Sequence, residues 1–322
     1  MNFIFADNYL DETKVKMSPM REGAGLGLAE LGALHADVIV VGADTLESCR
    51  AHHFTEKFPD RTIQVGVAEQ NLIGVCAGLA YEGKVPFGIT YAPFLIGRAW
   101  EPIRTTIAYP SNHVILLASH AGIATGTDGP THQMTEDIAL TACLPGFTVL
   151  APCDHEQARL AVKAAYDLKG PVYIRCAREA TPVFTTPETP FVVGKVQILR
   201  EGTDATVIGH GYMTYRLLQI AEELKELSIE VINVHTIKPL DIETIVASAK
   251  KTGKVFVAED HNIVGGLGSI IASALAEHVP VPVKSHGVYD IFTESGSAKD
   301  LWGKYGLDTE GTKKALLDFL QK

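Results

Sequence analysis

Two histidines and an aspartate lie in glycine-rich loop sequence after a strand-like run. His120 is in the segment Ser-His-Ala-Gly, and Asp128 and His132 are in the segment Asp-Gly-Pro-Thr-His-Gln. Loops at strand ends commonly position ligand groups, and imidazole and carboxylate side chains can move protons and bind sugar hydroxyls. Each histidine could instead be a surface residue. Their twelve-residue separation is not a usual spacing for close zinc ligands, so we expect a substrate site and no metal ligand in this chain.

Glu69 begins an apolar helical segment in the sequence Val-Ala-Glu-Gln-Asn. A glutamate at a helix start commonly complements the helix dipole, which is one interpretation. The other is a buried carboxyl group that donates or relays a proton, because Val67, Ala68, Leu72 and Ile73 are all apolar.

Aromatic and cationic side chains follow two further strand-like runs. Tyr91 and Phe94 come at the end of one run and either pack in the core or form a stacking wall for a flat heterocycle. Arg175 and Arg178 come at the end of another run, where a planar guanidinium can grip phosphate or carboxylate. The arginines could equally be solvated or paired with the neighbouring Glu179.

Short β-branched runs alternate with helical spacing, which predicts mainly parallel sheets covered by helices on both faces. Three prolines between residues 181 and 190 interrupt the alternation and indicate a linker. We therefore expect an α/β fold of two consecutive domains, residues 1–188 and 189–322, each a mostly parallel sheet flanked by helices. Strands are expected at residues 37–42, 61–66, 85–91, 114–119, 148–151 and 171–175 in the first domain, and at 205–209, 230–235 and 254–259 in the second.

Composition narrows the class of protein. Of 322 residues, 46% are hydrophobic, which is enough for a sizeable core. The 28 Lys and Arg against 38 Asp and Glu give a net charge of −10, so non-specific nucleic-acid binding is not expected. No uninterrupted apolar stretch approaches the roughly 20 residues of a membrane span, and we see no signal peptide. Five scattered cysteines without a Cys-x-x-Cys pair indicate reduced thiols and a cytoplasmic protein.

Several sequence blocks together resemble the C-terminal half of transketolase, as found in organisms that split this enzyme into two chains. The resemblance spans essentially the whole chain and implies a pyrimidine-binding domain followed by the transketolase C-terminal domain. Its most specific part is the Asp-Gly-Pro-Thr-His-Gln block. The blocks that carry it are residues 66–71, 90–94, 103–104, 119–123, 127–133, 237–241 and 259–268.

This resemblance implies a thiamine diphosphate-dependent enzyme that moves a two-carbon ketol unit between sugar phosphates, as in the pentose phosphate pathway. Glu69 would hydrogen-bond N1′ of the cofactor's aminopyrimidine, and Tyr91 and Phe94 would flank that ring. The implied catalytic residues are Glu69, His120 and His132. The implied substrate contacts are His120, Asp128 and His132 at the sugar, Arg178 at its phosphate, Arg21 and Ser48 as further phosphate contacts, and Arg175 as a neighbouring candidate.

The chain departs from the family pattern around the pyrimidine site. The family usually shows Ser-Thr-Phe where this chain has Ile89, Thr90 and Tyr91. A second aromatic residue expected shortly after Phe94 is absent, and Gly97 or Arg98 occupies that region. We therefore expect a pyrimidine pocket that is built slightly differently.

The Gly-Asp-Gly…Asn signature, which binds Mg²⁺ and the diphosphate in this superfamily, is absent from the sequence. Mg²⁺ needs oxygen ligands, which must then come from another polypeptide. We expect an N-terminal transketolase subunit as partner, an α2β2 assembly, and half of each active site on this chain.

Other classes of protein share parts of this pattern. A beta subunit of a 2-oxo acid dehydrogenase has the same layout and the same glutamate, but the segment from Asp128 to His132 fits sugar chemistry better. Deoxyxylulose phosphate synthase shares an Asp-Gly-x-Thr-His element but normally carries both halves on one chain. A catalytically inert binding partner need not retain Glu69, and a plain NAD-binding protein would show the dinucleotide fingerprint, which is missing.

Overall fold

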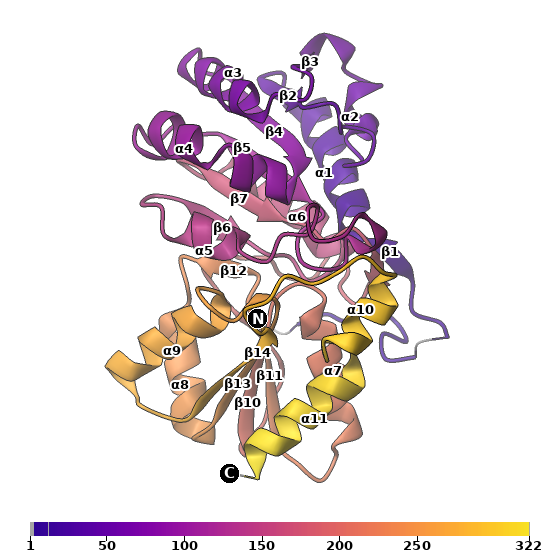
Figure 1. Cartoon of the computed structure of the whole chain (residues 1–322), viewed down its shortest axis with the longest axis vertical. Coiled ribbons are helices and arrows are strands. Elements are labelled where there is room, and N and C mark those ends of the chain that lie inside the picture. Colours follow the sequence, from indigo (N-terminus) through magenta and orange to yellow (C-terminus); the bar gives the residue numbers. More distant parts are fainter. Residues whose placement is uncertain (1–2, 12, 322) are drawn as a thin grey trace.

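The computed structural model describes residues 3–11 and 13–321 and shows two α/β domains stacked along the long axis (Figure 1). In the described residues, the sheet of the first domain has the strand order β12-β6-β7-β5-β4-β2-β3, in which β12 is Thr236–Lys238. All its strands but β12 are parallel, as their long apolar runs predict. They are β2 (Val38–Gly42), β3 (Thr62–Gln64), β4 (Val85–Tyr91), β5 (Ile115–Ser119), β6 (Thr148–Leu150) and β7 (Val172–Arg175).

Helices cover both faces of this sheet (Figure 1). One face packs against α1 (Met20–Leu34) and α6 (His155–Tyr166), which share a core cluster with Phe87 of β4. The other face packs against α3 (Glu69–Tyr81) and α5 (Asp137–Ala142), together with two π-helical segments, η2 (Pro93–Arg98) and η3 (Ile103–Ala108). Short turns complete the layer: α2 (His52–Thr55), η1 (Pro59–Arg61), α4 (Trp100–Pro102) and η4 (Gly126–Asp128).

The second domain repeats this architecture around a smaller sheet with the order β14-β13-β10-β11-β9 among the described residues. Every pair in it is parallel except β11 with β9. The mostly parallel α/β fold expected for both domains is therefore confirmed. The elements are β9 (Gln197–Arg200), β10 (Ala205–Gly209), α7 (Met213–Glu223), β11 (Ile229–Asn233), α8 (Ile242–Thr252), β13 (Val255–Asn262), α9 (Leu267–His278), β14 (Val283–Val288), α10 (Ala298–Lys304) and α11 (Thr309–Leu320).

Two short antiparallel strand pairs lie near the junction of the domains, and one of them crosses it. β12 (Thr236–Lys238) comes from the second domain but pairs antiparallel with β6 at the edge of the first sheet. β8 (Ala180–Pro182) begins the proline-rich linker and pairs antiparallel with β1 (Met17–Pro19) of the amino-terminal arm. The boundary at residues 188 and 189 stays a prediction, and β12 shows that the first sheet is completed from beyond it.

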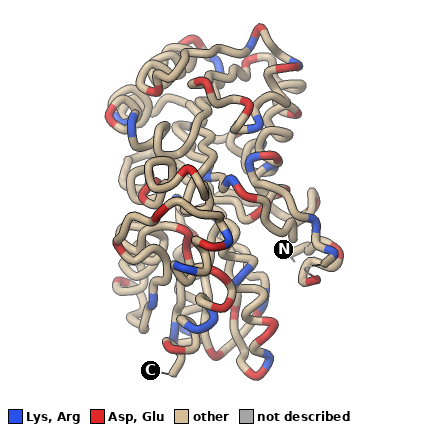
Figure 2. Tube along the Cα trace, turned by 45° about the vertical axis from the view of Figure 1, so that its right-hand side comes forward, with Lys and Arg blue, Asp and Glu red and all other residues tan. Residues whose placement is uncertain are grey.

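Charged residues of both signs are spread along the trace of both domains (Figure 2). The cysteines are all free, and four of them, Cys49, Cys76, Cys153 and Cys176, are buried. In the part of the chain that the structure describes, no helix has the length and apolar character needed to cross a membrane.

Candidate active site

The predicted site residues come from the carboxyl ends of neighbouring strands. Ser48 follows β2, Tyr91 ends β4, His120 follows β5, and Arg178 follows β7. Because parallel strands end at the same edge of a sheet, their loops meet there, which is where open α/β sheets bind ligands. Glu69 reaches the same group as the first residue of α3.

Glu69 is a buried carboxylate with one strong partner. Its side chain is 2% exposed, and Oε2 accepts a hydrogen bond of 2.7 Å from Nη1 of Arg98. Its setting is less apolar than the sequence suggests, because Val67 is 71% exposed and the guanidinium supplies an opposite charge. Leu72 and Ile73 are buried beneath it as expected.

Arg98 stands between Glu69 and an aromatic ring. Its guanidinium carbon lies 4.6 Å from the ring centroid of Phe94, and its side chain is 48% exposed. Phe94 in turn stacks against Tyr91, with centroids 5.8 Å apart and planes inclined by 22°. The guanidinium is flat and carries N–H donors, and the place that it occupies between a ring face and a carboxylate would suit a flat, nitrogen-bearing heterocycle. The residues present therefore fit an aminopyrimidine.

His120 is buried and stacks on Tyr91, whereas Arg98 lies over Phe94. Its ring lies 3.6 Å from that of Tyr91, centroid to centroid, and its Nδ1 is 2.5 Å from Oγ of Ser119. Its φ of 64° is in the left-handed region, which costs a non-glycine residue about 1–3 kcal/mol and is typical of functional sites. Burial, followed by the charges of Arg21 and Arg178, lowers the pKa of His120 to about 3. Its imidazole is therefore neutral near pH 7.

His132 lies near the other end of the loop that begins at His120, and its ring contacts the same aromatic pair. Its ring meets Phe94 edge-on with centroids 5.1 Å apart and lies 6.4 Å from Tyr91. Its Nδ1 is 2.9 Å from Oγ1 of Thr131, which leaves Nε2 as the outer nitrogen. Asp128, 37% exposed, lies 3.6 Å from Arg178. The structure thus brings Glu69 and both histidines around the Tyr91 and Phe94 rings.

Two arginines, Arg21 and Arg178, lie close enough to His120 to affect its charge. Arg21 donates to the backbone carbonyl of Ser48 at 2.6 Å, and Arg178 donates to the carbonyl of Thr125. Burial, then the nearby charges of Arg50 and Arg178, lowers the pKa of Arg21. Within the described residues, Nε of Arg21 is buried without a hydrogen-bond partner. Neighbouring guanidinium groups with a spare donor are suited to an anion such as a sugar phosphate.

Arg175 does not join this cluster. It is 4% exposed, its Nε donates to Oδ2 of Asp137 at 2.8 Å, and its Nη2 donates to the backbone carbonyl of Asp260 at 2.7 Å. Burial lowers its pKa, but the charges of Asp137 and Asp260 prevail and raise it. Because a strand alternates its faces, this strand-end arginine points into the domain junction rather than toward a ligand. The prediction of Arg175 as a substrate contact finds no support in this geometry.

Sequence analysis missed two contributors. Arg98 was noted as a departure, and its position four residues after Phe94 on a helical turn was the signal that it could reach the same ring. Asp260, from the second domain, accepts the backbone N–H of Ile123 in the histidine-bearing loop. The long separation in sequence left no local signal for that contact. No group of three His, Cys, Asp or Glu side chains able to hold a metal ion was found among the residues described.

Acidification should destabilise the fold through His120. In the unfolded chain this histidine titrates near 6.5, whereas in the fold its pKa is about 3. A lowered pKa means that the unfolded state binds the proton first, so stability is lost as the pH falls below about 6.5. His120→Asn is expected to reduce the stability loss between about pH 7.5 and about pH 5 by about 2 kcal/mol. Urea denaturation of both proteins at the two pH values measures this, and identical pH dependence would contradict it.

Both domains match known family models. Residues 16–183 match the transketolase pyrimidine-binding domain, and residues 194–311 match the transketolase C-terminal domain. The boundary predicted at residues 188 and 189 lies between these segments.

Relatives cover the chain almost completely. A putative transketolase C-terminal section from Methanocaldococcus jannaschii is 40% identical over 308 residues, which are 94% of this chain and 96% of that one. One of the subunits of apulose-4-phosphate transketolase from Phocaeicola vulgatus is 37% identical over 92% of this chain and 95% of its own.

A solved structure described as a split-gene transketolase, inactive beta4 tetramer, is 41% identical to this chain. It superposes with a TM-score of 0.87 over 94% of this chain and 98% of the other. The order of the domains and these near-complete matches agree with the site geometry. The chain belongs to the transketolase family, as the section that combines the pyrimidine-binding and C-terminal domains.

Proposed function

We propose that this chain is a subunit of a thiamine diphosphate-dependent transketolase that moves a two-carbon ketol unit from a ketose phosphate to an aldose phosphate. The observation that carries the proposal is that a flat group fits between the carboxylate of Glu69 and the ring of Phe94. The buried carboxylate of Glu69 pairs with the flat guanidinium of Arg98, which lies over the ring of Phe94. When bound, thiamine diphosphate supplies the electron sink needed to break a carbon–carbon bond beside a ketone.

In the proposed reaction, Glu69, Phe94 and Tyr91 contact the cofactor, and His120 and His132 contact the sugar. Glu69 holds a proton at N1′ of the aminopyrimidine, and Phe94 with Tyr91 fixes the plane of that ring. His120, which is neutral near pH 7, can accept and donate hydrogen bonds at sugar hydroxyls, and the Nε2 atom of His132, which takes no part in the contact with Thr131, is proposed to do the same. Burial of Glu69 limits competition by water for its proposed hydrogen bond to N1′.

The arginine cluster would hold the charged end of the sugar. Arg21 and Arg178 are the proposed phosphate contacts, with Asp128 and Ser48 at the edge of the same loops. The similarity to a relative named for apulose-4-phosphate supports a sugar phosphate as substrate but leaves the sugar itself open. Xylulose 5-phosphate and ribose 5-phosphate are the first donor and acceptor to use.

The proposed partner is an N-terminal transketolase subunit in an α2β2 assembly that supplies the ligands of Mg²⁺ and the diphosphate. Gly74 and Gly78 of α3 and Gly97 of η2 support a partner at this surface, because a Cβ at each would meet nothing within 4 Å. A glycine inside a helix costs about 0.5–1 kcal/mol relative to alanine, so glycines without a reason inside the chain favour a close approach from outside. The relative whose beta subunits form an inactive tetramer is consistent with dependence on a second subunit.

Free cysteines favour a reducing compartment, and we place the protein in the cytoplasm. No nucleic-acid or membrane partner is proposed.

Reconstitution tests the proposal directly. The chain, its candidate N-terminal partner, thiamine diphosphate and Mg²⁺ are mixed with xylulose 5-phosphate and ribose 5-phosphate, and a panel of other sugar phosphates follows. We expect ketol transfer by the mixture and none by either chain alone. Activity confined to pyruvate and lipoamide would instead support a 2-oxo acid dehydrogenase, and full activity of the lone chain would overturn the shared active site.

A further inference from the structure

Asp260 of the second domain is one of the residues through which that domain contacts the histidine-bearing loop. We define this loop as residues 119–133. Asp260 lies on β13 and is 2% exposed. Both of its carboxylate oxygens accept the backbone N–H of Ile123, at 3.1 and 3.2 Å. The histidine-bearing loop is thus tied to a charged group that is remote in the sequence.

The loop is shaped to receive this carboxylate. Gly122 has a φ of 76°, and a Cβ built on it would overlap Oδ2 of Asp260. A side chain at position 122 would therefore push the carboxylate away as well as strain the backbone. His120 lies two residues before this contact and has a positive φ of its own, 64°.

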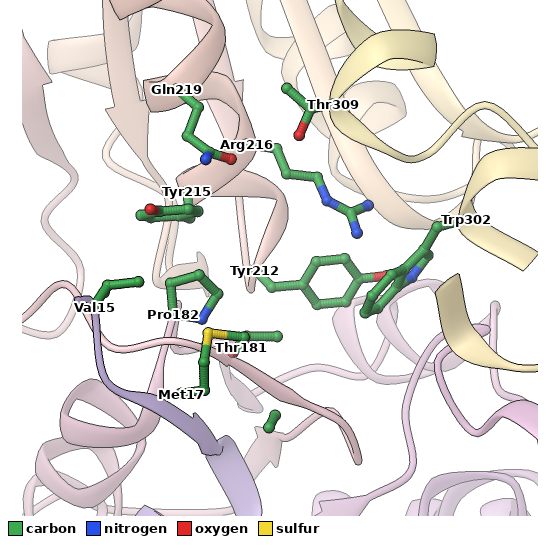
Figure 3. A pocket seen from close by; sticks show the side chains of 11 residues that line it. Val15, Met17, Thr181, Pro182, Tyr212, Tyr215, Arg216, Gln219, Trp302 and Thr309 are labelled. Atoms are coloured by element: carbon green, nitrogen blue, oxygen red, sulfur yellow. The ribbon is translucent and has the colours of Figure 1, made fainter. Parts of the chain in front are cut away.

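Further hydrogen bonds orient Asp260 from behind. The hydroxyl of Tyr212 on the segment before α7 donates to the carboxylate, and Nε1 of Trp302 donates to that hydroxyl oxygen at 2.7 Å. Figure 3 shows the Tyr212 ring directed toward Trp302 at the wall of a cavity of about 370 Å³. The carboxylate is therefore held from two sides, by the N–H of Ile123 in the loop and by Tyr212 of its own domain, which restricts its orientation.

The other end of the histidine-bearing loop is tied to the same domain. Nε2 of Gln133 donates to the backbone carbonyl of Glu294 at 3.1 Å. Oε1 of Gln133 accepts a hydrogen bond from the hydroxyl of Thr293. Asp128 and His132 lie between the two attachments. The second domain therefore fixes the loop that carries the proposed sugar contacts, whereas Glu69 and Phe94 belong to other elements.

We propose that Asp260 is a positioning residue for substrate: through Gly122 and Ile123 it places His120 and His132 for the sugar phosphate. The proposal rests on the proposed function, because it assigns these histidines to the sugar. It predicts separable effects on substrate and cofactor. Misplacing catalytic groups by about 1 Å can cost on the order of 10²-fold in rate.

Asp260→Asn in the reconstituted complex is the test. Asparagine keeps one acceptor oxygen but loses the charge that shortens and strengthens these bonds. We expect the KM for the ketose phosphate to rise about tenfold, while the affinity for thiamine diphosphate, followed by fluorescence titration, changes less than about twofold. Tyr212→Phe, which removes one donor to Asp260 without touching the loop, should shift KM in the same direction by less.

Glu230→Gln is the matched control. Glu230 is a buried acid of the same domain, on β11, and it accepts from Ser248 and Lys251 rather than from the histidine-bearing loop. It should lower stability without changing either KM or cofactor affinity. Wild-type KM in both Asp260→Asn and Tyr212→Phe, or an equal loss of substrate and cofactor binding, would overturn the proposal.

Hydrogen exchange separates this inference from the proposed function. In the isolated chain, Asp260→Asn should increase the exchange of amides 121–133, and Glu230→Gln should not. If the wild-type complex transfers no ketol unit, the proposed function fails, and the exchange data still decide whether Asp260 holds the loop. Unchanged exchange in Asp260→Asn would refute the loop attachment itself.

Discussion

Glu69→Ala is expected to abolish ketol transfer in the reconstituted complex while leaving the fold intact. The carboxylate is 2% exposed and is the acid in contact with the place proposed for the aminopyrimidine. Loss of a positioned proton donor typically costs about 10²–10⁴-fold in rate, and we expect kcat to fall by at least about 10³-fold. Steady-state kinetics measures the rate, and thermal unfolding followed by circular dichroism checks the fold.

Arg98→Ala separates chemistry from structure in this experiment. If Glu69 matters only because it pairs with Arg98, removal of either partner should have the same effect. If Glu69 acts on the cofactor, Arg98→Ala should keep kcat within about tenfold of wild type, because the cofactor replaces the guanidinium in the assembled enzyme. Equal losses in the two variants, or near-normal rates in Glu69→Ala, would remove Glu69 from the chemistry.

His132→Ala is expected to impair substrate turnover far more than cofactor binding. The imidazole meets Phe94 only at its edge and directs its outer nitrogen away from Thr131, which suits contact with the sugar rather than the pyrimidine. Loss of such a hydrogen-bonding and proton-transferring group predicts a fall in kcat/KM of about 10²-fold. Initial rates over a range of ketose phosphate concentrations measure it.

His113→Ala is the matched control for His132. His113 precedes β5, at the end of that strand opposite to His120, and its ring contacts the backbone carbonyls of Gly170 and Tyr166. Its removal should affect stability but not kcat/KM. A selective loss of thiamine diphosphate affinity in His132→Ala would contradict the assignment of this residue to the sugar.

Local sequence patterns predicted the parts of the site that depend on strand order. Tyr91, His120 and Arg178 were each placed at the end of an apolar run, and the carboxyl ends of parallel strands then bring such residues together. Burial of Glu69 was one of two interpretations of its place at the start of an apolar helix, and the side chain is buried. These features depend on the residues next to them in the chain.

Features set by contacts between domains could not be predicted in this way. Strand pattern placed Arg175 correctly at the end of β7, but its burial against Asp137 depends on how the second domain docks. Asp260 reaches Ile123 across 137 residues of sequence, and β12 leaves its own domain to complete the first sheet. No periodicity encodes a partner at such a distance.

The Glu69–Arg98 ion pair has a consequence for the life of the unassembled subunit. Without Arg98, a chain that has bound neither the proposed cofactor nor the proposed partner subunit would carry the Glu69 carboxylate buried and unpaired, which is strongly destabilising. The ion pair with Arg98 offsets this cost, so we expect the unassembled chain to stay folded. We expect the proposed cofactor to displace Arg98, so that its measured affinity would equal its intrinsic affinity reduced by the fraction of chains in which Arg98 has moved away from Glu69.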